Sequence, residues 1–287
     1  MAKNSGNTPQ TLKIPKLILI TSKFLQAISP KLAARFAARL FTTPLKYKIP
    51  KRELEMDRKS IQKLVKIPTI NKEVVVYKYG ENDRKILLVH GWSGRGTQLV
   101  KFADAFIKCG YETISFDAPA HGKSPGKTTL MPEFIATILE LEQQLGPFQA
   151  AVGHSLGGMS LLNSVKQGLK IKNLVVIGSG DIIQDIMDEF IEKLELKPEI
   201  STLLRLHFEK TSRQTMDSYS AYIAAKQIEI PVLVIHDNDD FEVLVKCAHH
   251  IVENLKNGKL MLTNGLGHRK ILGNPAVIER TFEFINN

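Results

Sequence analysis

The stretch Phe148-Gln-Ala-Ala-Val-Gly-His-Ser-Leu-Gly-Gly-Met-Ser-Leu-Leu-Asn-Ser-Val165 decides the fold. Its first five residues predict a short apolar strand, and apolar side chains recur at helical spacing from Gly158 onward. Between them, Gly153-His-Ser-Leu-Gly157 predicts a sharp turn from strand to helix. Such a turn strains one residue's backbone and tolerates only small neighbours. It presents Ser155 at the N-terminus of a helix, where free backbone N–H groups favour negative charge.

The pattern around this turn predicts an α/β protein. From Glu73 onward, strand-like runs alternate with helical runs, which indicates a mostly parallel, doubly wound sheet with helices on both faces. The expected strands cover residues 73–79, 85–89, 111–116, 148–152, 172–178, 230–235 and 259–263. Residues 181–228 contain helical stripes and no strand signal.

Three further turns follow strands and carry polar groups. His90-Gly-Trp-Ser-Gly94 follows one strand, His236-Asp-Asn-Asp-Asp240 follows another, and Asn264-Gly-Leu-Gly-His268 follows the last. Together with the serine turn, these motifs resemble the α/β-hydrolase superfamily in its serine-nucleophile form. The motifs span about residues 73–268 in the order Ser, Asp, His that this fold uses.

The resemblance implies a role for each motif. Ser155 would be the nucleophile and His268 the base, while the backbone N–H groups of Trp92 and Leu156 would form an oxyanion hole. Supporting positions would be His90, Gly91, Gly153 and Gly157. The region 181–228 would be a helical cap over the substrate.

The catalytic acid is open to three assignments. In the superfamily, a glycine is usually followed by two residues and then by the catalytic acid. This chain has Asp237 in place of that glycine, so Asp240 is the acid in this register. Asp239 is the neighbouring alternative, and Asp181, after the preceding strand, is used by some relatives. The departure at Asp237 has no explanation in the sequence.

The triad implies a serine hydrolase that cleaves a carboxylic ester or related acyl substrate, with no metal and no organic cofactor. Thioesterase, lactonase, amidase and carbon–carbon bond hydrolase activities use the same triad and stay open. A non-enzymatic alternative is a membrane-recruited interaction protein on a hydrolase scaffold. No module for specific nucleic-acid binding is recognisable.

The net charge of +10 is concentrated in residues 1–66, which hold 15 Lys or Arg and three acids; the remainder holds 24 basic and 26 acidic residues. We therefore expect a basic amphipathic extension at 1–66 and a catalytic domain at 67–287, with residues 1–12 disordered. Two helices are expected in the extension, the second starting at Ser29-Pro30. They either pack on the hydrolase body or make peripheral contact with an anionic membrane through residues 13–41.

The location expected from the sequence is the cytoplasm, with a peripheral position at the inner membrane surface left open. No apolar run in the extension reaches the roughly 20 residues that a membrane span requires. Cys109 and Cys247 have no metal-type spacing and are expected to be buried, reduced thiols.

Overall fold

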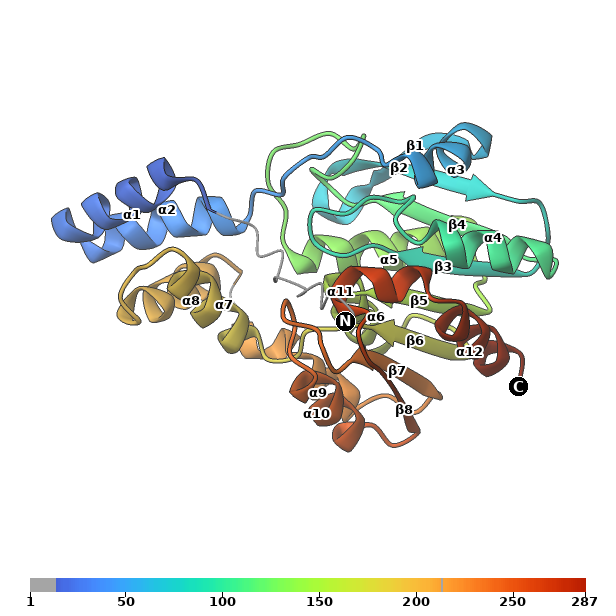
Figure 1. The fold of residues 1–287 in the computed structure, drawn as a ribbon. Helices are drawn as coiled ribbons and strands as arrows, with labels where there is room; N and C mark the ends of the chain where they lie inside the picture. Colours follow the sequence, from blue (N-terminus) through green and yellow to red (C-terminus); the bar gives the residue numbers. More distant parts are fainter. Residues whose placement is uncertain (1–13, 213) are drawn as a thin grey trace, which may run out of the picture.

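Eight strands form one sheet in the part of the chain that the computed structural model describes, residues 14–212 and 214–287 (Figure 1). They are β1 (Ile61–Ile67), β2 (Lys72–Tyr79), β3 (Lys85–Val89), β4 (Glu112–Asp117), β5 (Ala150–His154), β6 (Asn173–Ile177), β7 (Val232–Asp237) and β8 (Gly258–Thr263). Their order across the sheet is β1-β2-β4-β3-β5-β6-β7-β8. β2 is antiparallel to both of its neighbours, and the other pairs are parallel. The predicted mostly parallel sheet is confirmed.

The helices are α1 (Lys16–Ile28), α2 (Pro30–Phe41), α3 (Leu54–Lys59), α4 (Val100–Lys108), α5 (Met131–Leu145), α6 (Leu156–Lys166), α7 (Ile183–Lys193), α8 (Glu199–Ser212), α9 (Ala221–Ala225), α10 (Lys246–Asn254), α11 (Gly267–Lys270) and α12 (Pro275–Asn286). Short 3-10 turns occur at η1 (Lys51–Glu53), η2 (Pro68–Ile70), η3 (Met216–Tyr219) and η4 (Ile271–Gly273). The expected disordered segment 1–12 lies outside the described residues.

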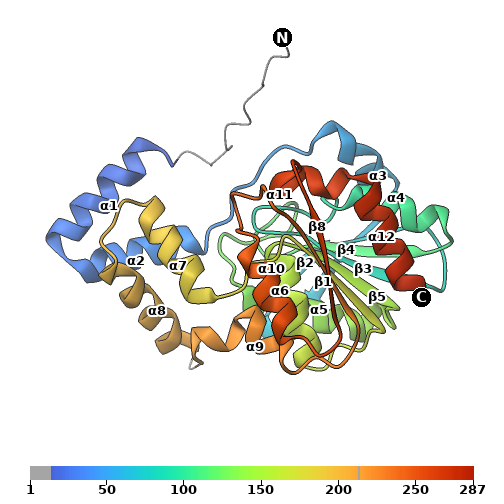
Figure 2. The same cartoon turned by 60° about the horizontal axis from the view of Figure 1, so that its bottom comes forward.

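Side chains that alternate along each strand build two apolar layers, one on each face of the sheet. In β3, Leu87 and Val89 face the layer that contains α5, α6, α9 and α10. Ile86 and Leu88 face the layer that contains α4 and α12. Helices therefore cover both faces, as Figure 2 shows for α6 and α12 on opposite sides of the strands.

A third apolar cluster lies in a helical arm beside the sheet (Figures 1 and 2). We call α1, α2, α7 and α8 the helical arm. Four alanines of α2 pack against α7 and α8, and each is at most 4% exposed: Ala33, Ala34, Ala37 and Ala38. The extension thus packs on α7 and α8, because small alanines let two helices approach closely.

Strand β1 is a correction to the expected boundary at residue 66, which falls inside this strand. β1 pairs with β2 along its whole length. It lies at the edge of the sheet, and most of its side chains are exposed on both faces. An exposed edge strand carries lysines and lacks alternation of apolar and polar residues, so its sequence gives a weak strand signal. Cys109 is a second correction, because this free thiol is exposed; Cys247 is free and half-buried.

Candidate active site

Ser155 lies at the turn between β5 and α6, with φ 53° and ψ −121°. This conformation is strained for a residue with a side chain. A Cβ atom on Gly153 would lie 2.7 Å from the backbone of Gly157, and one on Gly157 would lie 2.4 Å from the carbonyl oxygen of Val89. Both positions therefore require glycine, and the structure has the sharp turn from strand to helix that the sequence predicts.

His268 lies in α11, just beyond β8, and its Nδ1 is 2.7 Å from Oδ2 of Asp240. The side chain of Asp240 is 1% exposed and that of His268 is 8% exposed. The other oxygen of Asp240 accepts hydrogen bonds from the backbone N–H groups of Glu242 and Val243, each at 2.9 Å. These bonds fix the carboxylate so that it can hold the imidazole in one tautomer, with Nε2 free to accept a proton.

The two alternative acids make other contacts. Asp239 accepts a hydrogen bond from the N–H of Gly265 at 2.7 Å. Asp181 lies 2.5 Å from Nδ1 of His250 and accepts a bond from the N–H of Tyr222. Of the three carboxylates, Asp240 is the one that the structure brings to His268.

His154, the residue before Ser155, contacts His268. The ring centroid of His154 lies 4.6 Å from that of His268, and His154 Nε2 is 2.9 Å from the backbone oxygen of His268. Burial, and then the neighbouring His268, hold the pKa of His154 well below its ordinary value, so this ring is neutral. No hydrogen bond joins the Ser155 hydroxyl to His268 in the described structure; such contacts often tighten only when substrate binds.

The turn after β3 lies against the nucleophile. A Cβ atom on Gly91 would lie 3.0 Å from Cβ of Ser155, so the Gly91 backbone passes directly beside the serine. Gln98 Oε1 accepts a bond from the Gly91 N–H at 2.9 Å. Within the described residues, no hydrogen bond occupies the N–H of Trp92 or that of Leu156. These two donors are therefore free to bind an oxyanion.

Two buried histidines support this turn. His90 Nε2 accepts from the N–H of Ala118, and His121 Nε2 accepts from the N–H of Ser93, both at 3.0 Å. Burial lowers the pKa of His121 to about 4 and that of His90 well below its ordinary value. Both rings are thus neutral acceptors at neutral pH. They support the turn after β3 and supply no proton.

The extension also contacts this turn. The N–H of Leu45 donates to Ser93 Oγ at 3.0 Å, and Arg95 donates to the carbonyl of Lys48. The buried carboxylate of Glu53 accepts a bond from Thr97 Oγ1 at 2.9 Å. The segment between the arm and the sheet is therefore part of the support of the site.

Asp237, for which the sequence offered no explanation, organises the loop that carries His268. Its Oδ1 accepts from the N–H groups of Asp239 and Gly267, at 3.0 and 2.9 Å. Its Oδ2 accepts from Thr263 Oγ1 at 2.6 Å and from the N–H of Leu266 at 3.1 Å. Burial raises the pKa of Asp237, but these hydrogen bonds outweigh it and hold the pKa below its ordinary value. In the sequence, the only sign of this role was that Asp237 stands where the superfamily usually has glycine.

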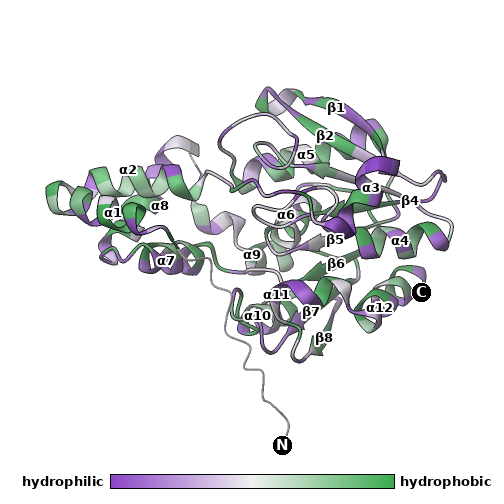
Figure 3. Cartoon of the chain, turned by 45° about the horizontal axis from the view of Figure 1, so that its top comes forward, coloured by the Kyte–Doolittle hydropathy of each residue, from purple (hydrophilic) through white to green (hydrophobic). Residues whose placement is uncertain are grey.

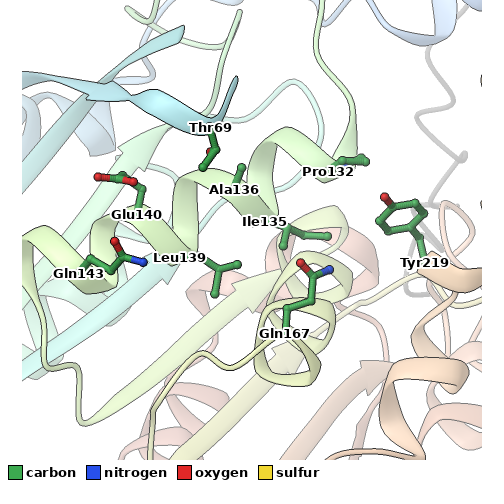
Figure 4. Close-up of a pocket in the computed structure, with 9 residues that line it drawn as sticks. All are labelled: Thr69, Pro132, Ile135, Ala136, Leu139, Glu140, Gln143, Gln167 and Tyr219. Carbon is green, nitrogen blue, oxygen red and sulfur yellow. The ribbon is translucent and has the colours of Figure 1, made fainter. Parts of the chain in front are cut away.

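A surface pocket of about 300 Å³ lies away from these residues (Figure 4). Its lining comes from α5, from Thr69 in η2, from Gln167 just beyond α6 and from Tyr219 in η3. Since Ser155 precedes α6 and a helix rises about 1.5 Å per residue, Gln167 is roughly 18 Å from the serine. The pocket is therefore separate from the candidate active site. No cluster of His, Cys, Asp and Glu suited to a metal ion occurs in residues 14–212 and 214–287.

The fold is similar to that of known proteins. A model of the alpha/beta hydrolase family matches residues 86–269, well over half of the chain. Among solved structures, a bromoperoxidase from Bacillus anthracis has a TM-score of 0.61 at 17% identity, covering 79% of this chain and 100% of its own. An esterase from Exiguobacterium antarcticum has a TM-score of 0.64 at 16% identity, covering 79% and 100%. No curated protein matches significantly.

A third solved structure extends further along the chain. It is a membrane phospholipase A, described as a bacterial virulence factor, with a TM-score of 0.63 at 15% identity. The match covers 94% of this chain and 96% of the other.

Proposed function

The chain belongs to the alpha/beta hydrolase family, and from this premise we propose that it is a serine hydrolase of carboxylic esters or related acyl substrates. Ser155 is the nucleophile, His268 the general base and acid, and Asp240 the residue that orients and stabilises the imidazole. The observation that carries the proposal is the buried contact of 2.7 Å between Asp240, in the loop after β7, and His268, beyond β8.

The first half of the reaction transfers the acyl group to the enzyme. Ser155 Oγ attacks the substrate carbonyl carbon while its proton passes to His268 Nε2. The carbonyl oxygen becomes negative and accepts hydrogen bonds from the free N–H groups of Trp92 and Leu156. The bond to the leaving group then breaks, and His268 returns the proton to the departing alcohol.

The second half releases the acid. Water gives a proton to His268 and its oxygen attacks the acyl carbon, again with the negative charge in the oxyanion hole. The tetrahedral intermediate then releases Ser155 Oγ, which takes the proton back from His268. A carboxylic acid leaves and the enzyme is regenerated.

The turns that carry the site residues also expose large apolar side chains, and these favour a substrate with an apolar acyl group. Trp92, which supplies one oxyanion N–H, is 37% exposed, and Phe241, which follows Asp240 directly, is 59% exposed. Leu244 in the same loop is 52% exposed. Apolar surface at the edge of a catalytic centre supports acyl chains over charged substrates.

A fluorophosphonate probe tests the proposal. It reacts with an activated serine, so we expect labelling of the folded protein and none after heating. Ser155→Ala should abolish labelling, whereas the matched change Ser218→Ala, at a half-buried serine of the cap, should leave it intact. Folded protein that no small fluorophosphonate labels would refute the proposed triad.

Substrate class is tested next, on p-nitrophenyl esters of increasing chain length and on matched thioesters. We expect turnover to rise with acyl length until the cap limits it. Preference for thioesters would assign the thioesterase alternative on the same triad.

A further inference from the structure

One helix of the arm has an uncovered apolar face. We call Leu17, Ile20, Phe24 and Ile28 the α1 stripe. Their spacing along α1 sets them on one face of the helix. They are 75%, 65%, 64% and 59% exposed. Figure 3 shows α1 and α2 largely in the hydrophobic colour, in the arm beside the sheet.

The opposite face of α1 accounts for its packing in the protein. Ile18 and Leu25 pack against the apolar cluster of the arm, and Ser22 is the buried residue of this helix. The α1 stripe therefore adds nothing to the core. Four large apolar side chains in one exposed row form a contiguous patch, which usually marks an interaction surface.

The charge around the α1 stripe has one sign. α1 and α2 carry Lys16, Lys23, Lys31, Arg35 and Arg39 and no acid. Lys23 pairs with Glu195 of the arm, and no ion pair engages the other four in the described structure. Because charges act over about 8–10 Å at physiological salt, those on α2 still act beside α1, a helix about 10–12 Å wide.

We propose that the α1 stripe docks this protein on the surface of an anionic lipid bilayer. The apolar side chains enter the boundary between headgroups and acyl chains, and the cations of α1 and α2 lie among anionic headgroups. No described helix is long and apolar enough to cross a membrane, so the helix lies in the plane of the surface. The proposal does not depend on the triad, because binding needs no turnover.

A second copy of this chain fits the surface less well. In a symmetric dimer the same face meets itself, so the unpaired cations of both copies would approach one another. A lipid surface instead supplies the opposite charge. It also offers an apolar layer that the exposed face of a single helix can enter, whereas a second copy would present another convex helix and no groove.

Vesicle flotation of the full chain tests the proposal, with Ser155→Ala in every sample so that no lipid is consumed. We expect binding to vesicles that contain phosphatidylglycerol and at least about tenfold weaker binding to phosphatidylcholine alone. The double variant I20S/F24S should weaken binding about tenfold or more. Its matched control, I61S/L64S, removes two apolar residues of β1 that are 59% and 57% exposed and should leave binding unchanged.

Two variants that remove charge separate the electrostatic contribution to vesicle binding from the apolar one. K31Q/R35Q should weaken binding to the anionic vesicles several-fold, and added salt should reduce the difference. K63Q/K66Q removes two exposed lysines from β1 and should have little effect. Thermal unfolding of each variant checks that the fold is kept.

Three results would overturn the proposal. One is the absence of binding to anionic vesicles by the folded full chain. Another is equal binding by I20S/F24S and its control. The third is a dimer, seen by light scattering, that I20S/F24S dissociates while vesicle binding persists; the α1 stripe would then be an interface between copies.

Discussion

Replacing Asp237 with alanine removes the acceptor of four hydrogen bonds, three of them from residues 263–267, just before His268. The N–H groups of Asp239, Leu266 and Gly267 and the hydroxyl of Thr263 lose their partner. If water replaces two of them, the other two orphaned donors cost roughly 1–3 kcal/mol each. We therefore expect the free energy of unfolding to fall by about 3 kcal/mol and the Tm by about 6–12 °C.

The same change should act on catalysis through the position of His268. Gly267, which precedes this histidine, is bound directly by Asp237. A displacement of about 1 Å at a catalytic group costs about 10²-fold in rate. We expect kcat for a p-nitrophenyl ester, and the rate of fluorophosphonate labelling, to fall together by about that factor while KM changes little.

A matched control and a pH series make this prediction decisive. Asp239→Ala removes a neighbouring carboxylate that accepts one bond, from the N–H of Gly265, and should change kcat less than about threefold. Since folding depresses the pKa of Asp237, its contribution to stability is full above about pH 4 and disappears as pH falls below that value. A folded Asp237→Ala variant whose kcat and labelling rate stay within threefold of the parent would refute this positioning role.

Three other predictions follow from the site and the arm. Asp240→Asn should lower kcat/KM by about 10⁴-fold, and Asp181→Asn far less; the reverse order in ester assays would reassign the acid. Because burial lowers the pKa of His121 to about 4, the stability of the protein should decline as pH falls from about 6.5 to 4. His121→Gln should flatten that decline in thermal melts. An unchanged slope would mean that the ring is protonated in the folded protein. Deleting residues 1–41 exposes the apolar partners of α2 on α7 and α8, so the truncated protein should unfold at lower temperature or aggregate; an unchanged Tm would show that α1 and α2 are dispensable to the fold.

Most of the sheet could be predicted because buried parallel strands have continuous apolar sequences and each ends in a turn residue. The strand at 85–89 was predicted with its observed limits, and those ending near Tyr79, His154 and Thr263 within two residues. β1 was missed, because an exposed edge strand has no buried face to impose a period. The helices between β6 and β7 were predicted from their helical stripes and from the absence of strand signals.

The sequence by itself determined the sharp turn at Ser155, the two glycines that the turn requires, and the order of Ser155, the candidate acids and His268. Those features are local, because steric limits on a few consecutive residues fix them. Only the tertiary structure decided which of three carboxylates contacts His268, which groups the Asp237 side chain binds, and that α2 packs on α7 and α8. Each of these depends on distances between segments far apart in the chain, which no local pattern encodes.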